Sequence, residues 1–233
     1  MPTQQMLGQV RELRDAGRTP KEIARALKIP PSQVTPLIRT IAAAEGRTRQ
    51  DTLIGCWISP DWSSSVQAPK RPDWPGSAPS ERTANSGLVS VLVARERGGP
   101  KTGVCLYLVD TWCLGLKNAA GPQSVDRRRL TGCIEQIFGN WDKPPLQVPL
   151  ELARQIIYGA IGYARELGFE PHPDFEPAAG YLEPWDGRCD LTFGLDGKPM
   201  YISGPYDDTH KIMRTLNRTV RDGNYHTTHA ISR

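Results

Sequence analysis

Long apolar runs and paired cysteines are both missing from the sequence. No stretch of the 233 residues approaches the roughly 18 consecutive apolar residues of a membrane-spanning helix, and the N-terminal segment MPTQQMLGQVRELRDAG is too polar for a secretory signal. The five cysteines form no CxxC pair and no Cys/His cluster with zinc spacing. Composition therefore excludes a secreted disulfide scaffold, a membrane protein and a zinc finger. We expect a cytoplasmic protein with reduced thiols and no membrane partner.

The common catalytic and nucleotide-binding signatures are missing as well. The sequence has no Walker loop, no GxGxxG, no GxSxG and no HExxH motif. We therefore predict no cofactor and no bound metal. What is present is a globular composition, with 38% hydrophobic and 23% charged residues, and a length that accommodates two domains.

Positive charge is concentrated at one end of the chain. Residues 1–50 hold nine Lys/Arg and four Asp/Glu, a formal charge of +5, whereas residues 51–233 hold twenty Lys/Arg and twenty-one Asp/Glu. A small basic module beside a nearly neutral larger one predicts binding to a polyanion.

The basic module has the pattern of three short helices, with the segment TPKEIARALKIPPSQVTPLIRTI at its centre. Thr19 and Glu22 fit a capping box with proline at the first helical position. Ala24 is the small residue that a helix-turn-helix needs where its two helices cross. The segment resembles the helix-turn-helix of MarR-like and AsnC-like regulators, although Lys28 replaces the usual turn glycine and no wing strands follow. Pro36 falls inside the third helix, where it delays the start of the helix or removes a hydrogen bond.

This motif predicts which side chains would contact DNA. The second helix of a helix-turn-helix enters the major groove, and a dimer is usually needed to reach two half-sites. We therefore predict a regulator that binds double-stranded DNA, with a homodimer as the expected assembly. The alternative is an RNA- or ribosome-associated protein that holds phosphates without base readout. The predicted base contacts are Ser32, Gln33 and Thr35, and the predicted phosphate contacts are Lys21, Arg25 and Arg39.

Residues 51–86 read as a linker. Residues 59–86 contain five Pro and seven Ser, which is typical of an extended, semi-rigid connection. Three tryptophans, Trp57, Trp62 and Trp74, would leave much apolar surface in water, so we expect this linker to dock partly on the next domain.

From Gly87 to Arg233 the pattern predicts an α+β domain, and hence an α+β fold class for the chain. We expect two antiparallel strands between 87 and 113, a hairpin with its turn at Asp196-Gly197, and three helices. The predicted helices span 125–138, 149–167 and a final segment ending at Gly223 that is capped by Asp207 or Asp208. Two glycines inside the second helix, Gly159 and Gly162, suggest that another backbone packs closely there.

Candidate catalytic residues in this domain are few. Asp110 ends an apolar strand, where metal-dependent nucleases place a carboxylate; Asp207, Asp208, Glu183 and Asp190 could be its partners, and capping of the next turn is the alternative. Cys113 and Lys117 could pair a nucleophile with a cation. His172 lies in a rigid Pro-His-Pro-Asp loop beside Asp174. Because no spacing demands that these groups converge, we predict that the domain binds rather than catalyses, with a metal-dependent nuclease as the alternative.

The larger domain contains four characteristic sequence segments: GLVSVLVARE, CLYLVDTWCLGLKNA, ELARQIIYGAIGYARELGFEPHPDF and FGLDGKPMYISGPYDD. The chain resembles a group of helix-turn-helix-containing proteins of high-GC actinobacteria that carry such a C-terminal α+β domain. The resemblance implies a cytoplasmic bacterial protein with two modules. It implies no catalytic residues. From the motif and the charge we expect a DNA-binding regulator in which the larger domain serves as a sensor, dimerisation or partner-binding unit.

Overall fold

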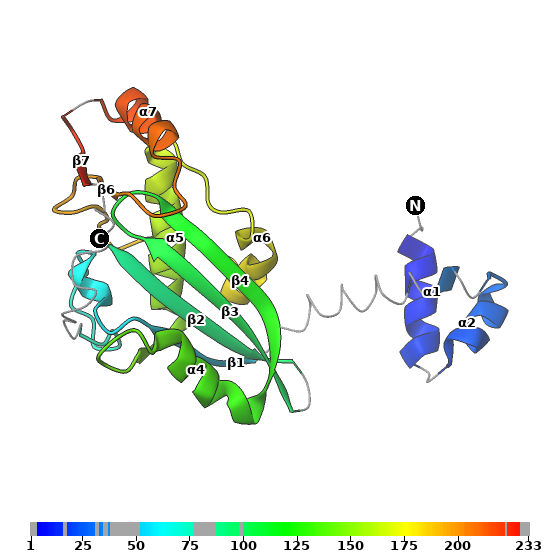
Figure 1. Cartoon of the computed structure of the whole chain (residues 1–233). Helices are drawn as coiled ribbons and strands as arrows, with labels where there is room; N and C mark the ends of the chain where they lie inside the picture. Colours follow the sequence, from blue (N-terminus) through cyan, green and yellow to red (C-terminus); the bar gives the residue numbers. More distant parts are fainter. Residues whose placement is uncertain are drawn as a thin grey trace. The chain divides into compact units, whose positions relative to one another are not determined.

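The computed structural model describes residues 4–15, 18–30, 33, 34, 37, 52–76, 87–97, 100–221 and 223–228. The chain divides into two compact units, Met1–Asp51 and Thr52–Arg233 (Figure 1).

The N-terminal unit contains α1 (Gln4–Asp15) and α2 (Pro20–Leu27). The capping box predicted at Thr19 is present: Glu22 N donates to Thr19 Oγ1 at 3.4 Å, and Thr19 N donates to Glu22 Oε2 at 2.7 Å. Lys28 ends α2 in the left-handed conformation, with φ +55°. The two helices share one small apolar core, formed by Val10, Ile23, Ala24, Val34 and Leu37. Most of the predicted third helix, including Pro36, lies outside the described residues.

The larger unit is built on a five-stranded antiparallel sheet, which confirms the predicted α+β class. The strand order is β4-β3-β2-β1-β5. The two strands predicted between 87 and 113 are β2 and β3, which pair from Leu88–Asp110 to Glu96–Thr102. The strands are β1 (Leu53–Ile58), β2 (Leu88–Glu96), β3 (Lys101–Asp110), β4 (Gly115–Asp126) and β5 (Leu146–Val148).

The prediction of a linker over 51–86, and of a domain starting at Gly87, differs from the structure. Strand β1 lies inside the sheet, where Cys56 pairs with Val93 on one side and Val148 on the other. Beyond it, Trp62 and Trp74 are buried at 2% and 7% exposure, which confirms the expected docking for these two rings. Over the described part of this stretch, residues 59–76, the Pro- and Ser-rich composition belongs to irregular backbone that contributes Trp62, Val66 and Trp74 to the core.

Successive side chains of β2 point to opposite faces of the sheet, and helices cover both faces. Val91 and Val93 belong to the core beneath α5 (Leu150–Glu166) and α6 (Phe175–Ala178). Leu92 and Ala94 pack with α4 (Leu130–Phe138) on the opposite face (Figure 1). The helix predicted from Val125 starts later than expected, because β4 continues to Asp126, whose Oδ1 accepts from Arg128 N at 2.8 Å and caps the 3-10 turn η2 (Arg127–Arg129).

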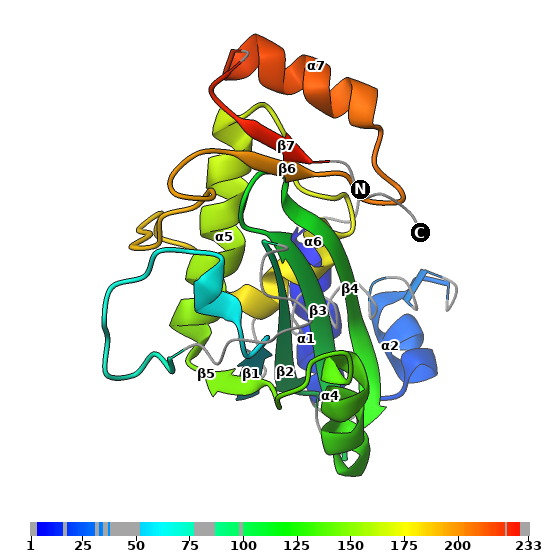
Figure 2. The same ribbon diagram turned by 60° about the vertical axis from the view of Figure 1, so that its left-hand side comes forward.

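The C-terminal segment forms a small layer at the β3–β4 turn end of the sheet (Figure 2). Asp196 and Gly197 make the predicted tight turn, with φ +52° and +79°, but the predicted hairpin reduces to a single Leu195–Lys198 bridge. Strand β6 (Met200–Ile202) instead pairs in parallel with β7 (His226–Thr228). Between them, Asp208 caps helix α7 (Thr209–Thr219). None of the helices in the described part of the chain has the length and apolar character needed to cross a bilayer.

Candidate functional site

The predicted nucleic-acid contacts are partly described by the structure. Lys21 and Arg25 are exposed and four residues apart on α2, so they lie on one face of the helix, away from buried Ile23 and Ala24. Gln33 is exposed as well. Ser32, Thr35 and Arg39 lie outside the described residues.

Asp110 closes the turn between β3 and β4. The residue is 6% exposed; Oδ1 accepts from Trp112 N at 2.9 Å and Cys113 N at 3.0 Å, and Oδ2 accepts from Leu114 N at 3.1 Å. Burial raises the pKa of Asp110, and these backbone donors oppose that shift. This geometry matches the turn-capping alternative. In the described ranges, no three His, Cys, Asp or Glu side chains come together as a metal site.

The carboxylates considered as partners of Asp110 each have another contact. Asp207 pairs with Lys117, and Asp208 accepts from Lys211 N at 3.0 Å as the cap of α7. Glu183 Oε1 lies 2.7 Å from Arg95 Nη2, and Asp190 pairs with Arg71.

Cys113 and Lys117 do not form the nucleophile–cation pair considered from the sequence. The Cys113 side chain is fully buried, and burial raises the pKa of its thiol. A neutral buried thiol is a poor nucleophile, and the Lys117 ammonium is held by Asp207.

His172 and Asp174 lie side by side, as the Pro-His-Pro-Asp loop predicts. The distance from His172 Nδ1 to Asp174 Oδ2 is 3.6 Å, and the side chains are 42% and 64% exposed. His172 N donates to Leu116 O at 3.1 Å, which fixes the loop on β4. The pair is a surface feature with no metal-binding cluster around it in the part of the chain that is described.

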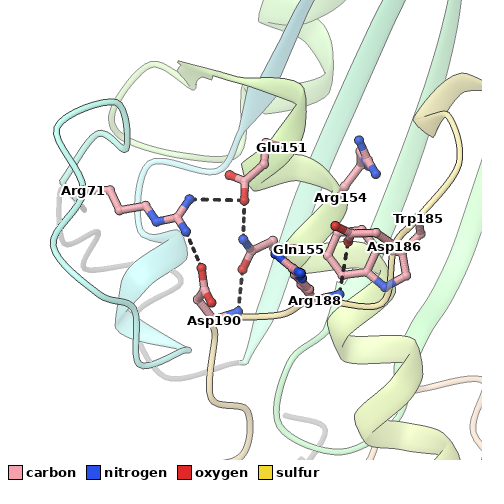
Figure 3. A pocket seen from close by; sticks show the side chains of 8 residues that line it. All are labelled: Arg71, Glu151, Arg154, Gln155, Trp185, Asp186, Arg188 and Asp190. Atoms are coloured by element: carbon pink, nitrogen blue, oxygen red, sulfur yellow. Dashed lines mark hydrogen bonds and ion pairs between the residues drawn. The ribbon is translucent and has the colours of Figure 1, made fainter.

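A pocket of about 330 Å³ lies beside the first turns of α5, between the segment after β1 and residues 185–190 (Figure 3). A hydrogen-bonded network forms one side of it. Arg71 binds both Glu151, at 3.3 Å, and Asp190. Gln155 joins the same two residues, since its Nε2 donates to Glu151 and its Oε1 accepts from Asp190 N at 2.8 Å. Trp74 Nε1 also donates to Glu151 Oε2, at 3.2 Å, so the polar side chains on this side of the pocket bind one another.

Two further cations of this pocket stand outside the network. The Arg154 guanidinium lies 5.4 Å from the centre of the Trp185 ring and donates to Pro184 O. Its Nε is buried without a hydrogen-bond partner. Arg188 contributes its backbone N to Asp186 Oδ1, at 3.1 Å. Among the residues that the structure describes, neither guanidinium forms an ion pair with a carboxylate.

A second pocket, of about 450 Å³, continues along α5 and shares Trp185 with the first. Its walls contain two stacked ring pairs: Tyr158 on Trp185, with centroids 5.5 Å apart, and Tyr163 on Phe193, with centroids 5.9 Å apart. The Tyr163 hydroxyl is buried without a hydrogen-bond partner. Four aromatic rings in the lining of one pocket are suited to a flat apolar ligand.

Two glycines of α5 line this second pocket, and their surroundings differ. A Cβ at Gly159 would lie 2.5 Å from Cys189 Sγ and 2.7 Å from the Phe193 ring, so a small residue is required there. A Cβ at Gly162 would meet nothing within 4 Å. Glycine inside a helix costs about 1 kcal/mol relative to alanine, and packing within the protein gives no reason for it at Gly162.

Sequence reasoning missed these pockets as a site. Of the residues in their linings, the sequence singles out Asp190 as a site candidate, and only as a metal-binding partner of Asp110. The signal that pointed to the region was the pair of helical glycines, read as a close approach of another backbone. At Gly159 the close neighbours are side chains, and at Gly162 the space is open.

Comparison of the chain with family models, with curated proteins and with solved structures gave no match. Its functional assignment therefore depends on the chemistry of its own residues.

Proposed function

We propose that the protein is a DNA-binding regulator whose residues 1–50 grip duplex DNA through a helix-turn-helix, while the larger unit serves as a sensor or interaction domain. The observation that carries this proposal is the arrangement of α2. Lys21 and Arg25 lie exposed on one face, and Ile23 and Ala24 are buried on the other. The segment around them carries a formal charge of +5.

The roles of the residues follow from that arrangement. In a helix-turn-helix the first helix crosses the DNA backbone, which suits exposed Lys21 and Arg25 as phosphate contacts. Ala24 is 4% exposed, and its small side chain suits the helix crossing of the motif. Exposed Gln33 follows the turn, where side chains reach base edges, and a glutamine can bind adenine with both of its amide atoms. Arg39 is assigned to phosphate, and Ser32 and Thr35 to bases.

Fluorescence anisotropy with a labelled random-sequence duplex tests this proposal. The intact chain should bind, and log K should fall with log salt by about 0.9 for each phosphate neutralised. A fragment lacking residues 1–50 should show no binding, because the remaining chain has no net positive charge. Undiminished binding by that fragment would contradict the assignment.

Point variants separate phosphate contacts from base contacts. Arg25→Ala should weaken binding to every sequence and reduce the salt slope by about one phosphate. Lys70→Ala removes one exposed cation from the larger unit and is the matched control, expected to bind as the wild type does. Gln33→Ala should change the preferred sequence, by about 1–3 kcal/mol at one base pair.

Two further measurements address the partner and the assembly. Tighter binding to a structured RNA than to a duplex DNA of equal length would favour the RNA- or ribosome-associated alternative. Sedimentation velocity of the DNA complex should give two chains per palindromic site, as half-site recognition requires.

A further inference from the structure

We infer that the two pockets sharing Trp185 form one binding site for a small planar aromatic anion. The site lies wholly within the larger unit, on α5, Arg71 and residues 185–197. It is independent of DNA binding by residues 1–50, and so it stands or falls separately from the proposed function.

The anion belongs beside Arg154. This guanidinium is held over the Trp185 ring, with its Nε buried and unpartnered, and no described carboxylate neutralises it. Arg154 lines the first pocket, but its Nε is shielded there. A carboxylate or phosphate in the pocket would therefore accept from the terminal Nη groups of Arg154, which can donate two parallel hydrogen bonds. The exposed side chain of Arg188 can contribute a second positive charge.

The ring belongs in the second pocket, over Gly162. Gly162 is an exposed position of α5 that lines this pocket, and a Cβ there would meet no protein atom within 4 Å. The stacked rings of Tyr158 and Trp185 line the same pocket, and so do the stacked rings of Tyr163 and Phe193. A flat ring that enters this pocket would contact aromatic side chains and bare backbone, where a branched aliphatic group would not fit as well.

The spacing along α5 joins these two halves. Arg154, Tyr158 and Gly162 recur every four residues, so they follow one line along the helix. The line is about 12 Å long at 1.5 Å per residue. That length matches a two-ring system with an anionic substituent at one end.

Titration calorimetry of the full-length protein tests the inference. The probes are 2-naphthoate, indole-3-acetate and adenosine 5′-monophosphate, which share a planar ring and differ in carrying a carboxylate or a phosphate. At least one should bind saturably, one per chain, with Kd below about 1 mM. Neutral 2-naphthamide and non-planar cyclohexanecarboxylate should bind at least about tenfold more weakly than 2-naphthoate or not at all, since each lacks one half of the recognised chemistry.

Matched variants locate the binding. Gly162→Leu should abolish it by filling the open space. Gly132→Leu replaces a helical glycine of α4 whose surroundings are equally open, and it should leave binding unchanged. Arg154→Gln should weaken the anions at least tenfold and leave any binding of 2-naphthamide unaltered. Arg154→Lys, which keeps the charge, should retain part of the affinity and shows whether the Gln variant lost charge or lost its fold.

Three results would overturn the inference. These are the absence of saturable binding by all three probes at about 1 mM, binding that survives both Gly162→Leu and Arg154→Gln, and binding that Gly132→Leu weakens as strongly as Gly162→Leu. If the carboxylates bind and the phosphate does not, the site takes an aromatic acid; the reverse outcome assigns it to a nucleotide.

Discussion

Lys117 and Asp207 form an ion pair that ties β4 to the loop before α7. The Lys117 Nζ lies 3.0 Å from both carboxylate oxygens of Asp207, and the two side chains are only 20% and 12% exposed. Asp207 Oδ2 also accepts from Gly204 N, at 2.8 Å, and from the Tyr201 hydroxyl, at 3.3 Å. Asp207 is therefore the polar centre of the C-terminal layer, while its neighbour Asp208 caps the helix.

The two adjacent aspartates should respond differently to the same substitution. Asp207→Asn leaves the Lys117 charge largely buried without a counter-ion, and we expect it to lower the free energy of unfolding by about 1–3 kcal/mol. Asp208→Asn should be nearly neutral, because asparagine is an equally good helix cap. Tryptophan fluorescence during urea unfolding measures both changes. All six tryptophans lie between residues 57 and 185, so the signal reports the larger unit alone.

Equal effects of the two substitutions would contradict this account of the pair. A double variant, Lys117→Met with Asp207→Asn, checks it further. If the loss comes from the uncompensated ammonium, removing that charge should restore part of the stability lost in Asp207→Asn.

The domain boundary makes a second prediction. A fragment that starts at Asp51 should unfold cooperatively, because it retains β1 and the buried rings of Trp62 and Trp74. A fragment that starts at Gly87 loses the strand between β2 and β5, and its core should be exposed to solvent. We expect no cooperative transition for it in thermal unfolding followed by fluorescence. A sharp transition in the shorter fragment would show that β1 is dispensable.

That boundary also shows what the sequence could and could not reveal. Strands β2 and β3 and helix α5 were predictable, because their apolar patterns are long and their ends carry turn or cap residues. Strand β1 has six residues and is followed by a Pro- and Ser-rich stretch. Composition alone cannot distinguish irregular backbone that packs on a core from a free connection. Only the three tryptophans pointed to packing.

The candidate site was less predictable than the fold. Arg71, Gln155 and Trp185 are far apart in the sequence and belong to no motif, so only tertiary structure brings them together (Figure 3). Asp110 illustrates the opposite problem. A strand-end carboxylate fits both a metal site and a turn cap, and three backbone donors decide for the cap in this structure.

Thiol reactivity gives a third prediction. Burial raises the pKa of Cys56 and Cys105 to about 12, and also raises that of Cys113. Because the thiolate is the reacting form, these three should resist Ellman's reagent in the native protein. Exposed Cys189 and half-buried Cys133 should react, giving at most two of five equivalents, and all five should react in denaturant.

The rate of that reaction should increase with pH. Burial also raises the pKa of Cys189, so its reaction rate should keep rising with pH beyond 9, the ordinary value for a thiol. Cys189→Ser should remove one reactive equivalent, and Cys113→Ser none. Fast labelling that disappears in Cys113→Ser would instead restore Cys113 as a candidate nucleophile.

The two pocket glycines of α5 should respond in opposite ways to alanine. Gly162→Ala adds a methyl group that meets no protein atom and removes the helix penalty of glycine, so stability should rise by about 1 kcal/mol. For a unit of this size that corresponds to a melting temperature higher by about 2–4 °C. Gly159→Ala gains the same helix propensity but forces the methyl against Cys189 and Phe193. Overpacking of this kind costs about 1–3 kcal/mol, so the net change should be destabilising.

The Cys189→Ala change separates the two contributions at Gly159. Removing the sulfur that lies 2.5 Å from the added Cβ should recover part of the stability lost in Gly159→Ala, whereas it should leave the gain in Gly162→Ala unaltered. Differential scanning calorimetry of the three single variants, the two double variants and the wild type gives these differences directly. A destabilised Gly162→Ala would mean that the open space is filled by the protein in solution, and the position would then need glycine for packing. A stabilised one means that glycine is kept there at a measurable loss of stability, as a position that accommodates a ligand would require.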